Sequence, residues 1–173
     1  MAQQTINTGS GVNKGDGDSL RTSFNKVNDN FTEVYSLLGA EGGGGSGLQS
    51  RSTATGTTSS LADAAQTDLD ITGFKSYTLM AITTDKAARV RLYVNAATRT
   101  ADAARAEGID PTSDAGVIAE VITTGAETVI ISPGAYGFNL ESSPTTNIPC
   151  RVTNKSGSTG TVQVDVNILQ LEA

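Results

Sequence analysis

The clearest pattern in the first third of the chain is a helical one. Apolar residues recur between positions 20 and 38 at spacings of four, three, four, three and four residues, which is the heptad repeat of an amphipathic helix. These six residues, called the seam from here on, are Leu20, Phe24, Val27, Phe31, Val34 and Leu38. Asp18 or Ser19 suits the N-cap, and Gly39 suits the end of the helix.

A seam this narrow cannot form a core by itself, because an isolated helix of this length is marginally stable in water. We therefore expect the seam to pack against the same helix in another copy of the chain, or against another protein. The alternative is that the helix docks on a globular part of its own chain.

A two-residue period replaces the helical one after residue 61. In the last such segment Val162, Val164, Val166 and Ile168 alternate with polar residues, which is typical of a strand with one buried face. Eight strands are expected, at 67–72, 75–84, 89–95, 117–123, 128–132, 136–140, 148–154 and 161–171. With Gly, Pro and Asn turns between them, they predict a mainly β fold: an antiparallel, jelly-roll-like β-sandwich. The Ala-rich range 96–107 predicts one helix within it.

The remaining segments set the domain boundaries. Residues 1–18 are mostly polar and predict an extended arm. Residues 39–60 are rich in Gly, Ser and Thr, with four consecutive glycines at 42–45, and predict a flexible linker. We therefore divide the chain into an N-terminal arm and attachment helix (1–38), a linker (39–60) and a β-sandwich domain (61–173).

The composition excludes several kinds of active site. The 173 residues include no His and a single Cys, Cys150, so imidazole-based triads, thiolate zinc sites and intrachain disulfides are excluded. Cys150 follows Pro149 and is expected to be a small core residue. The net charge of −6 argues against nucleic acid as a partner. No apolar run approaches the ~20 residues that span a bilayer, and the N-terminus lacks the features of a signal peptide, so we expect neither a membrane partner nor export.

Two acidic groups invite a chemical interpretation. The first, in a Gly-rich turn, could offer oxygen ligands to Ca²⁺, but the EF-hand pattern is absent, so we expect a turn followed by an N-cap. It consists of Asn13, Asp16 and Asp18. The second could supply paired carboxylates for acid–base catalysis, but its surroundings predict a solvated loop. It consists of Asp63, Asp68 and Asp70.

Arg99, Asp102 and Arg105 lie three residues apart on the predicted helix and share a face of it. They could form an anion or carbohydrate site, with Asp102 orienting two guanidinium groups. They could equally form a local ladder of ion pairs or a contact between subunits, and we assign them to structure, as candidate interface residues. We therefore predict no catalytic residue, no cofactor and no metal, and hence no enzyme.

Residues 5–38 follow a specific sequence pattern, IN.G…GDGDSLR.AF.K.N.NF.ELY. The positions of this chain that match it include Gly15, Asp18, Leu20, Arg21, Phe24, Lys26, Asn28, Asn30, Phe31 and Tyr35. With this pattern the segment resembles an N-terminal segment of virion structural proteins of tailed phages, in particular cyanophages and other myoviruses, where it precedes variable domains. Ser23 departs from the pattern, since Ala is usual there. Residues 90–121 also resemble β-domains of cyanophage virion proteins.

The resemblance implies a non-enzymatic virion protein of the tail, baseplate or neck, an adaptor or tail-fibre protein assembled in the host cytoplasm. Its N-terminal segment would attach it to other virion proteins, and its β-domain would assemble with copies of itself. A homotrimer is expected, because phage fibres are commonly threefold. The alternatives are a module for host attachment that binds a surface glycan, and a capsid decoration protein. The absence of Trp and the total of only eight Phe and Tyr disfavour a glycan site.

Overall fold

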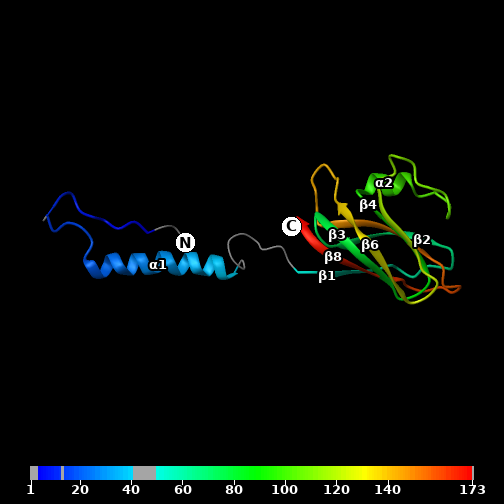
Figure 1. Ribbon diagram of the computed structural model, residues 1–173, viewed down its shortest axis with the longest axis horizontal. Helices are drawn as coiled ribbons and strands as arrows, with labels where there is room; N and C mark the ends of the chain where they lie inside the picture. Colours follow the sequence, from blue (N-terminus) through cyan, green and yellow to red (C-terminus); the bar gives the residue numbers. More distant parts are fainter. Residues whose placement is uncertain (1–3, 13, 41–49, 173) are drawn as a thin grey trace. The chain divides into compact units, whose positions relative to one another are not determined.

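The computed structural model describes residues 4–12, 14–40 and 50–172, with the side chains of 37–40 outside the description. The chain forms two compact units, Met1–Gly47 and Leu48–Ala173, which are drawn in Figure 1.

The N-terminal unit consists of the arm and helix α1 (Leu20–Ala40). Ser19 is the N-cap, because its side-chain Oγ accepts from the backbone N–H of Thr22 at 3.2 Å and its carbonyl accepts from Ser23 at 2.9 Å. The helix continues through Gly39 to Ala40, so the prediction that Gly39 ends it is wrong by one residue, a common uncertainty at helix ends. The arm runs back alongside the helix (Figure 1).

The second unit is an antiparallel β-sandwich, as predicted. Its strands are β1 (Ser52–Thr57), β2 (Gln66–Thr72), β3 (Ser76–Thr84), β4 (Ala88–Tyr93), β5 (Val117–Ile122), β6 (Glu127–Phe138), β7 (Asn147–Asn154) and β8 (Gln163–Glu172). They form two four-stranded sheets, in the orders β1-β8-β3-β6 and β2-β7-β4-β5. Because most successive strands alternate between the sheets, this is the order of an eight-stranded jelly roll.

The predicted and observed elements differ in three places. A strand, β1, lies inside the predicted linker 39–60, and it pairs with β8 over six residue pairs, so the sandwich begins before residue 61. The predicted strands 128–132 and 136–140 are one strand, β6. The predicted helix 96–107 is only α2 (Ala96–Ala101), because Asp102 already has the backbone of a C-cap.

The core lies between the two sheets. Alternate residues of β8 point into it, for example Val164 and Val166, and so do Leu79 and Ile82 of β3, all fully buried. The three-residue spacing on β3 comes from a β-bulge between Leu79 and Ala81. Cys150 on β7 is also fully buried there, as predicted, and burial raises the pKa of its thiol to about 12. Every residue of β4 is buried, since α2 and the segment that follows it pack on the outer side of this sheet.

Candidate functional site

The arm is fixed to α1 by side chains of the helix. The side chain of Asn30 accepts from the backbone N–H of Gln4 and donates to the carbonyl of Gln4, both at 2.9 Å. The ammonium of Lys26 donates to the carbonyl of Thr5 at 3.0 Å and to Asp18 Oδ2 at 2.6 Å. The arm therefore has a defined register along the helix.

Asp18 closes the turn between the arm and the helix. Its Oδ2 also accepts from the backbone N–H of Asn7 at 2.8 Å, and its own N–H donates to the carbonyl of Asn7 at 2.7 Å. The hydrogen bond from Lys26 is the main reason that the pKa of Asp18 lies below its usual value. Asp18 thus clamps the arm instead of capping the helix, which corrects one of the two predicted N-caps.

Two glycines allow this turn to close. Gly9 has a φ of +82°, and a Cβ there would lie 2.6 Å from Asp16 Oδ1. A Cβ on Gly17 would lie 2.9 Å from the carbonyl oxygen of Asn7. Asp16 accepts from the backbone N–H of Ser10 at 3.1 Å. Several residues of the sequence pattern at 5–38 therefore serve one purpose, the closure of the arm onto the helix.

These contacts bear on the Ca²⁺ interpretation. The carboxylates of Asp16 and Asp18 are occupied by N–H donors, and Asn13 lies outside the described residues. Among the residues that the structure describes, no group of three or more His, Cys, Asp or Glu side chains is arranged to hold a metal ion.

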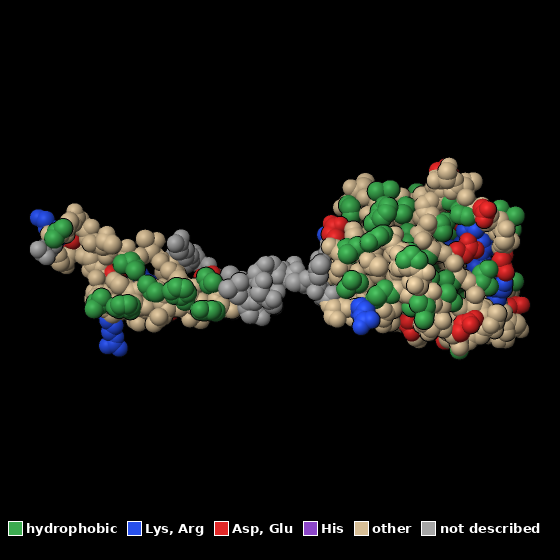
Figure 2. Space-filling model, viewed as in Figure 1, with side chains coloured by type: hydrophobic (Ala, Val, Ile, Leu, Met, Phe, Trp, Pro, Cys, Tyr) green, Lys and Arg blue, Asp and Glu red, His purple; other side chains and the backbone are tan. Residues whose placement is uncertain are grey.

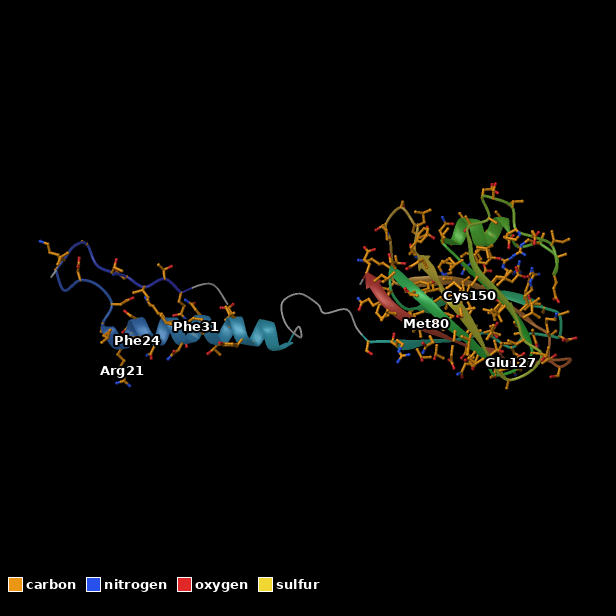
Figure 3. The ribbon with its side chains drawn as sticks, in the orientation of Figure 1. Arg21, Phe24, Phe31, Met80, Glu127 and Cys150 are labelled. Carbon is orange, nitrogen blue, oxygen red and sulfur yellow. The ribbon has the colours of Figure 1, made fainter. Side chains whose placement is uncertain are left out.

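The seam remains exposed beside the arm. The exposed fractions are 74% for Leu20, 58% for Phe24, 57% for Phe31 and 48% for Val34, whereas Val27 is half-buried. The side chain of Leu38 lies outside the described residues. Figure 2 shows a row of apolar side chains along α1, and Figure 3 labels Phe24 and Phe31 on it.

Sequence reasoning missed one residue beside the seam. Tyr35 is 69% exposed, and its ring centroid lies 6.3 Å from that of Phe31. Its position four residues after Phe31 was the signal that could have found it, because such residues are neighbours on a helix surface. The exposed apolar surface is thus wider than a strict heptad stripe.

The β-sandwich unit carries a network of arginines and carboxylates on the outer side of the second sheet. Asp102 lies at its centre: its carboxylate pairs with Arg91 at 3.3 Å and with Arg105 at 2.7 Å, and it accepts from the hydroxyl of Tyr93 at 2.7 Å. Burial opposes its ionisation, but the hydrogen bonds from Arg105 and Tyr93 outweigh burial and lower the pKa of Asp102. This part of the network ties the segment after α2 to β4.

Glu120 on β5 extends the network. Its carboxylate lies 2.6 Å from Arg89 and 2.7 Å from Arg105. Burial again opposes ionisation, and the two guanidinium groups reverse its effect, so the pKa of Glu120 is lowered. Asp102 and Arg105, which the sequence predicts to be neighbours, therefore do contact each other. Their further partners, Arg91 on β4 and Glu120 on β5, could not be predicted from the spacing.

Arg99 takes different partners from those predicted. It contacts Asp70 at 2.6 Å and Asp68 at 3.4 Å, and Asp68 also pairs with Arg151 at 2.6 Å. Asp68 and Asp70 lie on β2, so the prediction of a solvated loop is wrong for them. Asp63 does lie outside the strands, and it accepts from the backbone N–H of Gly157 at 2.9 Å.

A hollow of about 280 Å³ lies next to Arg105. Asp102, Asp110 and Asp114 line it together with Arg105, so the negative charges outnumber the positive one. Such a lining repels an anion, which argues against the anion-site interpretation of Arg99, Asp102 and Arg105. Their role between subunits stays a prediction, although their charges already have partners within the chain.

Comparisons of the chain with models of protein families, with curated proteins and with solved structures find no match. Within the described residues, no helix combines the length and the apolar character needed to cross a membrane.

Proposed function

We propose that this chain is a non-enzymatic structural protein of a tailed-phage virion, an adaptor or fibre protein of the tail, baseplate or neck. Its N-terminal unit docks it, and its β-sandwich is the part that the docked chain carries. The sequence resemblance of residues 5–38 to phage attachment segments supplies the virion context.

One observation carries the proposal. The residues of the phage-like pattern fix the arm to one flank of α1 and leave Phe24, Phe31 and Val34 of the seam about half exposed. An ordered helix with an uncovered apolar stripe loses less entropy on docking than a disordered segment would. The N-terminal unit is therefore suited to binding, either to a copy of itself or to another virion protein.

The test is the double variant Phe24→Asp with Phe31→Asp. Each substitution places a charge in the seam, so we expect loss of self-association in light scattering and loss of the protein from purified particles. The thermal unfolding of the β-sandwich should not change. The matched control is Asn25→Asp with Thr32→Asp, which adds the same charge at exposed positions of α1 outside the seam.

Normal incorporation of the Phe24 and Phe31 variant into particles would refute the docking assignment. A wild-type mass of a single chain, 17.7 kDa, would refute self-association and leave docking on another virion protein. A mass of three chains is expected for the homotrimer.

A further inference from the structure

The outer face of the sheet β1-β8-β3-β6 carries a group of exposed and half-buried apolar side chains, called the β-patch from here on. Its members are Met80 on β3, Ile130, Tyr136 and Phe138 on β6, and Leu169 and Leu171 on β8. The exposed fractions are 75% for Ile130, 73% for Tyr136, 44% for Phe138 and 42% for Leu171. Apolar side chains gather over β3, β6 and β8 in Figure 2, and Figure 3 labels Met80.

The strand register brings these side chains together. Thr78 of β3 is paired with Tyr136 on one side and with Leu169 on the other. Ser76 is paired with Phe138, and both lie on the same outer face of the sheet as Thr78 and Tyr136. Residues directly opposite on neighbouring strands have Cβ atoms about 5 Å apart, so the β-patch is one continuous surface. Contiguous exposed apolar patches mark sites of association.

Charge distinguishes the β-patch from its surroundings. The unit 48–173 contains 13 Asp and Glu against 9 Lys and Arg, a net charge of −4. Lys75 and Glu172 lie beside the β-patch next to Ser76, which donates to Glu172 at 2.9 Å. Arg51 directly precedes β1, whose Ser52 is paired with Ile168, and it therefore lies beside Leu169. Asp165 lies at the other end of the sheet, where it is paired with Thr83. A second copy of this negative chain is repelled by most of the unit and meets no excess of negative charge here.

The position of Asp165 favours contact between copies further. Thr78 and Thr83 are five residues apart on one strand, about 17 Å at 3.3 Å per residue. Asp165 therefore lies more than a Debye length from Thr78 and Tyr136, so its charge is screened at the centre of the β-patch.

The β-patch is too small to form a stable contact without help from another part of the chain. Three strands about 4.8 Å apart and some five residues of each, at about 3.3 Å per residue, give a footprint of about 240 Å². Stable interfaces bury about 800 Å² on each partner. The eleven residues between α1 and β1 span at most about 40 Å when extended, so assembly of α1 holds the β-sandwich units of neighbouring copies at millimolar local concentration.

We infer that the β-patch is the contact between the β-sandwich units of neighbouring copies of this chain, brought together by assembly of α1. The inference rests on the proposed function for its helix step, and it places the contact between copies on the first sheet rather than at Arg99, Asp102 and Arg105.

The experiment uses the full chain with a cysteine introduced in the β-patch, Ile130→Cys, and a short bis-maleimide. The native thiol of Cys150 is fully buried and does not compete. We expect covalent dimers on a denaturing gel. The matched control is Ile109→Cys, which is also an exposed isoleucine, at 60%, outside the first sheet. It should give few dimers. Adding Tyr136→Glu to Ile130→Cys should reduce the dimer yield at least several-fold.

The outcomes separate this inference from the proposed function. A wild-type oligomer in light scattering with a dimer yield from Ile130→Cys no higher than that from Ile109→Cys overturns the inference and leaves helix assembly intact. The β-patch would then belong to another occupant, such as a host surface glycan. If strong cross-linking of Ile130→Cys persists when Phe24→Asp and Phe31→Asp are added, that result supports the contact and shows that it does not require assembly of α1.

Discussion

Asp102 is the residue on which the polar network of the β-sandwich unit most depends. Its side chain is 5% exposed and neutralises Arg91 and Arg105, which are 0% and 8% exposed. Asp102→Ala leaves both guanidinium groups buried without their shared partner, so we expect a loss of about 3–5 kcal/mol in the free energy of unfolding. Urea denaturation of the purified chain measures it.

The control is Asp70→Ala. Asp70 also pairs with a buried arginine, Arg99, but its own side chain is 52% exposed, and solvent screens the pair. We expect a loss of about 1 kcal/mol or less. Equal losses in the two variants would contradict the central role of Asp102.

The sequence predicts the direction of a side chain on a strand better than it predicts its burial. The alternation in 89–95 predicts that Val90 and Leu92 face one way and Arg89 and Arg91 the other, and the structure confirms this. The period does not show that the segment after α2 covers the polar face, where the carbonyls of Asp102 and Arg105 accept from the buried guanidinium groups of Arg91 and Arg89. Periodicity reports the direction of a side chain, whereas burial depends on which distant element packs over it.

At the scale of elements, β1 is the clearest departure from expectation. Its sequence, STATGT, has a single buried apolar residue, Ala54, and its composition is that of a linker. It is a strand because β8 provides backbone partners along its whole length, and tertiary pairing overrides weak local propensity. The predicted total of eight strands was right only because two predicted strands, 128–132 and 136–140, are the single strand β6.

The role of β1 gives a prediction about fragments. A fragment 50–173 retains β1 and should unfold cooperatively at the temperature of the β-sandwich in the full chain. A fragment 61–173 lacks it, exposes the edge of β8 and uncovers Ile71, against which Gly56 packs closely. We expect its melting temperature to fall by about 10 °C or more, as a loss of several kcal/mol requires. Circular dichroism at increasing temperature compares the two, and equal melting temperatures would show that β1 is dispensable.

For the whole molecule, the absence of His sets the response to pH. His and reactive thiols are the side chains that ordinarily titrate between about pH 5 and 8. This chain has no His, and burial raises the pKa of the Cys150 thiol to about 12. The stability of the chain should therefore be level across neutral pH. The carboxylates that support each unit have lowered pKa values: Asp16 and Asp18 in the N-terminal unit, Asp102 and Glu120 in the β-sandwich.

The sign of the acid response follows from these shifts. A carboxylate whose folded pKa lies below its unfolded value contributes stability that is complete above the unfolded value, near 4, and is lost as the pH falls through the folded value. We expect the melting temperature of the β-sandwich to stay constant from about pH 8 to 5 and to fall below about pH 4. Near-ultraviolet circular dichroism of its buried tyrosines, Tyr77 and Tyr93, follows the transition at each pH. Asp102→Asn is already neutral at position 102, so its melting temperature should be lower at pH 7 and decline less toward pH 3. A decline as steep as that of the wild type would assign the acid response to other carboxylates.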